Sequence, residues 1–163
     1  MRQAEPDQAA LDGLIVEAAL FDSGRPMLVV PYIQRNGLRL DRILLCWDGS
    51  RSSARAVADA LPFLRRAKAV EVVTVASEPA KSDEMRGADI AHHLARHGVK
   101  VELKRIVTAE TDVASTILSH AADSSADFLV MGGYGHSRLR EFILGGVTRE
   151  ILASMTVPVL MSH

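Results

Sequence analysis

Length, composition and charge limit the classes of protein to which this chain can belong. It has 163 residues, 48% of them hydrophobic and 24% charged, which suits one folded domain with a sizeable core. A formal net charge of −1 argues against a general nucleic-acid-binding protein, because such proteins normally carry a basic surplus. The single cysteine, Cys46, excludes an intramolecular disulfide, and its apolar surroundings in the sequence are typical of an inert buried thiol. The chain shows neither a targeting signal nor an apolar run of roughly eighteen residues, so we expect a cytoplasmic protein without a membrane-spanning segment.

Residues 1–40 are expected to form an extension that precedes the main domain, residues 41–163. Their pattern predicts a helix over Pro6–Phe21, a turn, a short strand over Met27–Val30 and a linker. This stretch resembles the last helix and strand of the chain. The aligned pairs are Leu20 with Leu152, Pro26 with Pro158 and Leu28 with Leu160. We interpret the extension as the final helix and strand of a preceding domain of the same kind; the alternative is a chance similarity of two short stretches.

From residue 41 onward, apolar runs alternate with amphipathic stretches. The apolar runs predict strands at Ile43–Trp47, Val70–Ala76, Val99–Val107, Phe128–Met131 and Val157–Met161. The third run alternates more than the others, which favours the edge of a sheet. Helices are predicted at Ser52–Arg66, Asp83–His97, Asp112–Ser124 and Val147–Met155, with Ser52 and Thr111 as N-caps. Such alternation requires right-handed crossovers. We therefore expect an α/β fold with a doubly wound, five-stranded parallel sheet in the order 3-2-1-4-5, flanked by helices.

Glycines cluster where the fourth predicted strand ends and where the last predicted helix begins. Gly132, Gly133 and Gly135 follow the strand, and Gly145 and Gly146 precede the helix. Glycine lets backbone N–H groups approach an anion closely, and the first N–H groups of a helix are unpaired and carry partial positive charge. A phosphate group is therefore the expected ligand.

The spacing Gly132-x-x-Gly135, then nine residues, then Gly145-Gly146 resembles the nucleotide loop of the universal stress protein family. The resemblance extends from about Leu40 to the C-terminus and includes the segments ILLCWDGS and VPVLM. It implies binding of ATP or ADP, with Mg²⁺ as a further candidate ligand. It also implies that Asp48 faces the adenine, that Cys46 and Val75 line the adenine pocket, and that Met131 and Gly132 contact the nucleoside. The residues that would surround the phosphates are Gly135, His136, Gly145, Gly146, Val147 and Thr148.

One position departs from the family pattern. ATP-binding members usually carry serine where this chain has Gly146, so a hydroxyl donor worth about 0.5–1.5 kcal/mol is lost. Thr148 could replace part of that contribution, so we expect weakened rather than abolished binding. The sequence has no G-x-x-x-x-G-K-[ST] loop and no evident catalytic base near the glycines, which favours a stress-response binding module over an enzyme. The alternatives are an interaction protein of the same fold that binds no nucleotide and, ranked below it, slow ATP hydrolysis or phosphotransfer.

Two other clusters have a simpler interpretation. His93 and His97 share a helix face, with His92 nearby, but no third ligand with metal-site spacing is evident, so a solvated helix face is favoured over a metal site. The arginines at positions 138, 140 and 149 either neutralise bound phosphates or only solvate the surface.

The last predicted strand, Val157–Met161, should lie at a sheet edge that must be covered or paired. Family members commonly dimerise through this strand, so the resemblance implies a homodimer or higher oligomer. We expect Met27–Val30 to pair with it, within one chain or exchanged between two chains. The apolar face of the first helix would then pack at the same junction; we assign to that face Leu11, Leu14, Ile15 and Ala18.

Overall fold

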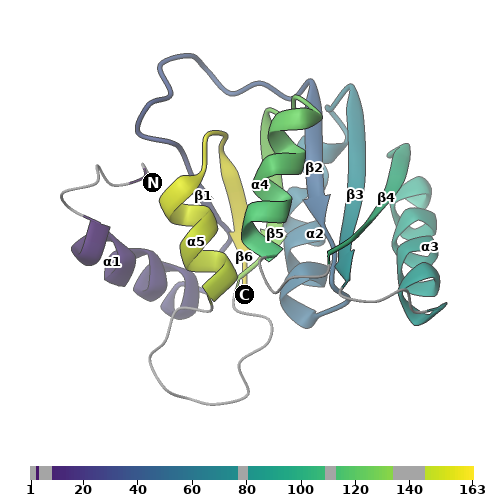
Figure 1. Ribbon diagram of the computed structural model, residues 1–163, viewed down its shortest axis with the longest axis horizontal. Helices are drawn as coiled ribbons and strands as arrows, with labels where there is room; N and C mark the ends of the chain where they lie inside the picture. The colour runs from purple at the N-terminus through teal and green to yellow at the C-terminus, as the bar shows by residue number, and fades with distance from the viewer. Residues whose placement is uncertain (1–2, 4–8, 77–80, 109–112, 134–145) are drawn as a thin grey trace.

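The computed structural model describes residues 3, 9–76, 81–108, 113–133 and 146–163. In this part of the chain, helices flank both faces of a six-stranded sheet (Figure 1). The helices are α1 (Ala9–Asp22), α2 (Arg51–Leu64), α3 (Lys81–Arg96), α4 (Val113–Asp123) and α5 (Gly146–Ser154). The strands are β1 (Met27–Val29), β2 (Arg42–Cys46), β3 (Ala69–Ala76), β4 (Val101–Val107), β5 (Phe128–Gly132) and β6 (Val159–Ser162).

The strand order is β1-β6-β5-β2-β3-β4. Strands β2 to β6 run parallel, and β1 pairs antiparallel with β6. The predicted α/β class is confirmed, and the five parallel strands follow the predicted order. The sheet differs from the predicted five-stranded one in having six strands, because the N-terminal strand joins it as an antiparallel member beside β6. The alternating run at Val101–Val107 lies at the sheet edge, as predicted.

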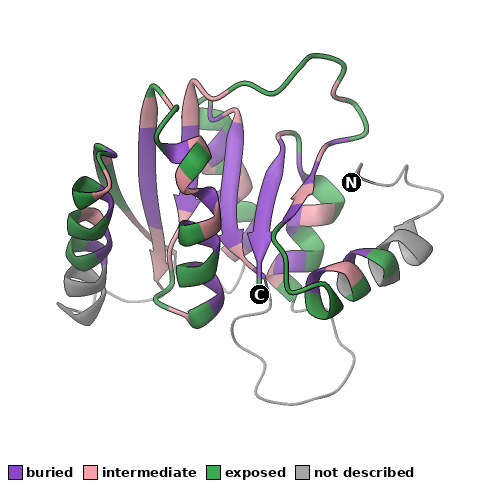
Figure 2. Cartoon of the chain, turned by 180° about the vertical axis from the view of Figure 1, so that it is seen from behind, coloured by how far each residue is buried: buried purple, intermediate pink, exposed green. Residues whose placement is uncertain are grey.

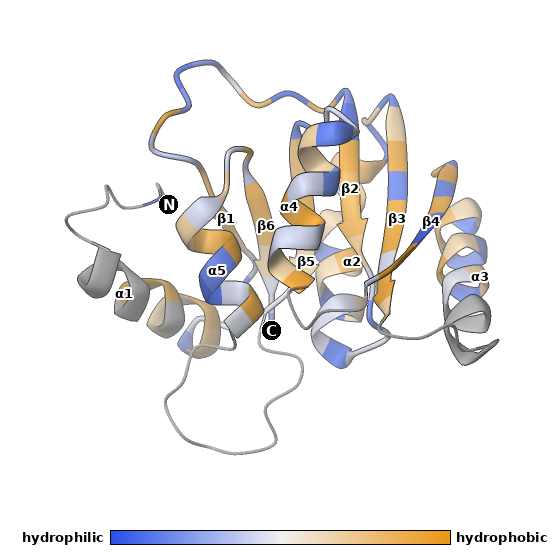
Figure 3. Cartoon of the chain, in the orientation of Figure 1, coloured by the Kyte–Doolittle hydropathy of each residue, from blue (hydrophilic) through white to orange (hydrophobic). Residues whose placement is uncertain are grey.

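The two faces of the sheet carry two separate hydrophobic cores. One core joins α1, α4 and α5 to one face, through residues such as Leu20, Ile117 and Ile151. The other joins α2 and α3 to the opposite face, through residues such as Ala60 and Leu94. The central strands are buried along most of their length and are the most apolar part of the molecule (Figures 2 and 3). Burial on both faces explains why their sequences read as continuous apolar runs.

The N-terminal strand pairs with the last strand inside one chain. Met27 lies opposite Met161, Leu28 opposite Leu160 and Val29 opposite Val159. This register confirms the predicted pairing of these two strands. The helix and strand boundaries repeat as well: α1 ends at residue 22 and α5 at 154, and β1 begins at 27 and β6 at 159, a spacing of 132 positions each time. Leu28 and Leu160 have the same spacing, so this facing pair is the centre of a local two-fold arrangement.

Two local predictions are corrected by the structure. Among the α1 side chains that the structure describes, Val16 and Leu20 are buried, whereas Ile15 is 49% exposed and Ala18 is also exposed. The side chains of Leu11 and Leu14, assigned to the same face, lie outside the described part of the chain. The helix is apolar around most of its circumference, so its sequence does not select a face. The N-cap of α2 is Ser50, whose backbone is extended and whose side chain accepts a hydrogen bond from the N–H of Ser53; the predicted Ser52 lies inside the helix. The predicted cap Thr111 falls outside the described residues.

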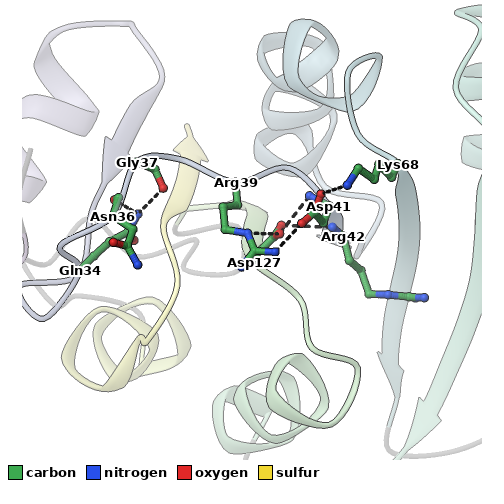
Figure 4. A network of polar contacts seen from close by, with 8 residues as sticks. All are labelled: Gln34, Asn36, Gly37, Arg39, Asp41, Arg42, Lys68 and Asp127. Atoms are coloured by element: carbon green, nitrogen blue, oxygen red, sulfur yellow. Dashed lines mark hydrogen bonds and ion pairs between the residues drawn. The ribbon is translucent and has the colours of Figure 1, made fainter.

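Polar contacts fasten the linker to the end of the sheet at which β2 and β5 begin (Figure 4). The Asp127 carboxylate accepts hydrogen bonds from the backbone N–H groups of Asp41 and Arg42, at 2.9 and 3.1 Å. Lys68 and Arg39 each place a nitrogen 2.6 Å from the Asp41 carboxylate. These hydrogen bonds to the two cations lower the pKa of Asp41. The carboxyl ends of the strands, at the opposite end of the sheet, are left for a binding site.

Candidate functional site

The candidate site lies at the carboxyl ends of the parallel strands, where the strand order reverses between β2 and β5. Open α/β sheets bind ligands at such switch points, because the crossover helices depart in opposite directions and leave a crevice. Cys46 ends β2, and Met131 and Gly132 end β5. The structure therefore brings together residues 85 positions apart that the sequence analysis had assigned to one pocket.

A group of apolar side chains converges at this end of the sheet. Cys46, Val75 and Val147 are partly buried and pack against the core that contains Met131, which is 5% exposed. Two residues that the sequence analysis missed join them: Ile106, which lies opposite Val75 in the strand register, and Val113, at the start of α4. We call this group the apolar platform; its members are Cys46, Val75, Ile106, Val113, Met131 and Val147. Counting residues from the carboxyl end of each parallel strand would have identified Ile106.

The thiol of Cys46 is not a nucleophile in this setting. Burial, with a smaller contribution from the nearby Asp48 carboxylate, raises the pKa of the Cys46 thiol to about 12. Only a thiolate attacks an electrophile or binds a metal strongly, and at neutral pH almost none is present. Cys46 therefore contributes apolar surface to the platform.

Asp48 has a structural role in the turn that leads into α2. Its Oδ1 accepts a hydrogen bond of 2.9 Å from the backbone N–H of Ser50, across Gly49, whose φ is +73°. This side-chain-to-backbone turn fixes the start of the helix. The residue is exposed, so the carboxylate remains at the surface of the crevice. The predicted contact with adenine is compatible with this geometry.

Gly132 has a packing role that the sequence did not reveal. A Cβ at this position would lie 2.5 Å from the backbone nitrogen of Ser53 and 2.8 Å from the carbonyl carbon of Ser52. The end of β5 therefore touches the backbone at the start of α2, and any side chain there would push the helix away. A substitution of Gly132 would consequently disturb the fold and could not isolate an effect on phosphate binding.

The start of α5 is open. Gly146 is the first helical residue and is exposed, and a Cβ placed on it would meet no atom of the described residues within 4 Å. Two residues farther on, Thr148 is only 3% exposed, so a ligand at the helix start would meet Gly146 first. The predicted phosphate contacts Gly135, His136 and Gly145 lie outside the described residues, as do Arg138 and Arg140.

A cavity of about 510 Å³ extends from the platform along the gap between β4 and α4. Ile106 belongs to both, and the other lining residues are Lys104, Val107, Thr108, Ser115, Thr116, Ser119, His120 and Asp123. His120 Nε2 also lies 2.9 Å from a carboxylate oxygen of the buried Glu71, whose other oxygen lies 3.4 Å from Arg42. The contact between His120 and Glu71 ties α4 to the sheet, and the Glu71 carboxylate is paired with the Arg42 guanidinium.

The histidines of α3 form no metal site in the described part of the chain. The rings of His93 and His97 lie 4.7 Å apart, and Arg65 donates to the backbone oxygen of His97. A guanidinium beside the rings is unfavourable for a bound cation. Within the described residues, no group of three or more His, Cys, Asp or Glu side chains could hold a metal ion.

The helices of the described part of the chain are also too short or too polar to span a membrane.

Comparison with known proteins agrees with this architecture. The family model described as "Universal stress protein family" matches residues 39–163. The chain belongs to the universal stress protein family. Among curated relatives, it is 26% identical to universal stress protein Slr1230 from Synechocystis over 154 residues, which cover 91% of this chain and 50% of that protein.

Solved structures of this family share the fold. A universal stress protein from Archaeoglobus fulgidus, 21% identical, superposes with a TM-score of 0.70 over 98% of this chain and 58% of its own. A universal stress protein determined in complex with cAMP, 23% identical, gives a TM-score of 0.60 over 76% of this chain and 96% of its own. The present chain thus spans only about half of the length of the Synechocystis and Archaeoglobus relatives.

Proposed function

We propose that this universal stress protein is a cytoplasmic stress-response module that binds an adenine nucleotide, ATP or ADP, at the carboxyl ends of β2, β3 and β5. The observation that carries the proposal is the apolar platform beside the open start of α5. A flat aromatic base gains by covering apolar surface, and a phosphate gains from unpaired N–H groups at a helix start. Val147, which belongs to the platform and follows Gly146 on α5, supports placing both at the same end of the sheet.

Adenine would cover the platform while its exocyclic amino group faces Asp48. The phosphates would lie at Gly146, and Mg²⁺ would be carried in with them. Without the serine hydroxyl usual at this position, binding is weaker by about 0.5–1.5 kcal/mol, which corresponds to roughly 2- to 12-fold in affinity. The open space around Gly146 means that this loss arises from one missing side chain and not from a blocked site.

The module acts by binding rather than by turnover. Cys46 is held as a neutral thiol, and the Glu71–His120 pair is committed to contacts between α4 and the sheet. We rank slow ATP hydrolysis or phosphotransfer below simple binding for this reason.

A second candidate function is that of an interaction protein that has kept the fold and binds no nucleotide. The N-terminal segment favours it, because Ile15, Phe21 and Ile33 are 44–51% exposed. The edge of β6 is occupied by β1 of the same chain. Two copies could therefore join at this edge only by exchanging α1 and β1. We interpret these two elements as the end of a preceding domain, which their 132-residue spacing from α5 and β6 supports.

The nucleotide proposal is tested first on the purified protein. Acid extraction followed by chromatography should release ATP or ADP. Isothermal titration calorimetry with ATP, ADP, GTP and cAMP should rank the adenine nucleotides above GTP; cAMP is included because a structural neighbour was determined with it. Absence of bound nucleotide together with absence of binding heat would leave the interaction protein as the better proposal.

Gly146→Ser tests the phosphate position. The new hydroxyl should tighten ATP binding by about 2- to 12-fold, because it adds one hydrogen-bond donor at a position with room for a side chain. Gly146→Ala is the matched control: it adds the same Cβ without a donor and should leave the affinity nearly unchanged. Equal affinities for the serine and alanine variants would contradict a phosphate at this helix start.

Asp48 is tested through base specificity. Asp48→Ala should reduce the preference for ATP over GTP more than it reduces overall affinity, because a carboxylate accepts from the adenine amino group. Asp48→Asn is the better-controlled variant, since its amide oxygen can still accept from Ser50 while its NH₂ can donate to the guanine carbonyl. The asparagine variant should therefore also reduce the preference for ATP over GTP. If only the alanine variant changed binding, the role of Asp48 would be confined to the turn.

A further inference from the structure

The last turn of α1 reaches the edge of the candidate site. Leu20 is 2% exposed, and a Cβ built on Gly133 would lie 2.7 Å from its Cδ2 atom. The side chain of Leu20 therefore rests directly on the backbone of Gly133. That glycine follows β5 and stands between Gly132 and the segment assigned to the phosphates.

The C-terminal residues of the chain make further contacts with Gly133. The rings of Phe21 and His163 meet edge to face, with centroids 4.4 Å apart, and His163 Nδ1 lies 3.2 Å from the carbonyl oxygen of Gly133. The N–H of Gly133 donates to the carbonyl of Ser162 at 2.8 Å. Both backbone polar groups of Gly133 are thus engaged by the end of β6, and α1 packs against its α-carbon.

The turn that follows α1 is fastened from the other face of the sheet. Arg55 on α2 donates to the carbonyl oxygen of Gly24 at 3.0 Å and pairs with Asp59 at 3.0 Å. Asp59 in turn accepts a hydrogen bond of 2.9 Å from the hydroxyl of Ser162. The turn after α1 and the end of β6, to which Gly133 is hydrogen-bonded, are therefore both held by the Arg55–Asp59 pair.

We propose that the last turn of α1 is a positioning element of the nucleotide site. Leu20 and Phe21, acting through Gly133 and His163, fix the position of the backbone at the point where the chain leaves β5. This inference rests on the proposed function. The family model begins at residue 39, so α1 lies outside the part of the chain that matches it.

The core test is a double-mutant cycle read by ATP calorimetry. Gly133→Ala should weaken ATP binding by at least 5-fold, because the new methyl group collides with Leu20. Leu20→Ala should weaken it as well, because Gly133 loses its support. The double variant should recover affinity to within about 2-fold of the wild type, since the added methyl group occupies space that the leucine vacates. Leu94→Ala, equally buried but in the opposite core, should lower the melting temperature and leave ATP affinity unchanged.

A surface variant covers the case in which the core variants fail to fold. Phe21 is 44% exposed, so Phe21→Ala should fold and should weaken ATP binding by about 3-fold as His163 loses its ring contact. Ile15→Ala, on the same helix and similarly exposed, is its matched control and should bind ATP like the wild type. Unchanged affinity in Phe21→Ala, or in both core single variants, would overturn the inference while the wild type still binds ATP. A wild type that binds no ATP would overturn the proposed function itself and this inference with it.

Discussion

The first helix–strand pair, α1–β1, and the last, α5–β6, are built to the same plan and lie side by side. Each helix is followed by a strand after the same interval, and Leu28 of the first pair faces Leu160 of the last. Both helices pack on the same face of the sheet. Through this arrangement β1 completes the sheet edge by pairing with β6, while α1 covers the same face of the sheet as α5.

The differences between the two pairs concern what surrounds each helix. Val147 of α5 packs into the core beside α4, whereas Ile15, its counterpart on α1, is 49% exposed. Gly146 opens the start of α5, and the corresponding position on α1 is Leu14. The start of one helix is thus suited to a ligand. In our proposal, the end of the other supports that site from outside.

The largest expected effect is that of removing the first pair. Deleting residues 1–36 uncovers the edge of β6 and removes, among the described residues, the buried core side chains Val16, Leu20, Met27 and Val29. At about 1.5–3 kcal/mol each, the loss exceeds about 5 kcal/mol, which is comparable to the whole stability of many domains. Light scattering should show a new oligomer or aggregate, and the melting temperature should fall sharply relative to the full chain. A truncated protein with unchanged mass and melting temperature would mean that the pair is dispensable.

A matched pair of variants tests how far the two helices are equivalent. Leu20 and Leu152 occupy corresponding positions, but Leu20 is 2% exposed and Leu152 is only partly buried. Leu20→Ala should reduce the free energy of unfolding by about 2–5 kcal/mol, and Leu152→Ala by roughly half as much or less. Urea denaturation measures both changes. Equal losses would indicate that the two helices are held alike, despite their different burial.

The smallest expected effect is that of removing Arg55, which holds the turn between α1 and β1 through its hydrogen bond to Gly24. Arg55→Ala removes the hydrogen bond to Gly24 and the pair with Asp59, but the side chain of Arg55 is 51% exposed. Exposed ion pairs contribute at most about 1 kcal/mol, so the free energy of unfolding should fall by no more than that. Arg51→Ala, at an exposed position on the same helix, is the control and should change little. A loss of several kcal/mol for Arg55→Ala would mean that the N-terminal pair is held by polar contacts and not by its buried side chains.

Much of the fold could be predicted from the sequence, because its elements carry strong local patterns. The apolar runs around Ile43, Val72 and Leu129 could only be strands buried on both faces, and the helices between them required parallel crossovers. The resemblance to the universal stress protein family implied that Cys46 and Val75 line an adenine pocket and that Met131 contacts the nucleoside, and the three residues belong to one apolar group in the structure.

Other features were decided by tertiary contacts. Three neighbouring serines could each cap α2, and in the structure Ser50 is the cap. The approach of β5 to the same helix start requires glycine at position 132. The helix α1 is apolar on most sides, so its sequence could not indicate that Val16 and Leu20 would be buried and Ile15 exposed. Its contact with Gly133 joins residues 113 positions apart, and no local pattern encodes such a contact.

The sequence by itself determined the elements, the parallel sheet and the end of the sheet at which a ligand is expected, because these follow from local periodicity. Only the tertiary structure decided which side of α1 faces inward and what it supports, because that choice depends on the shape of the surface against which the helix packs.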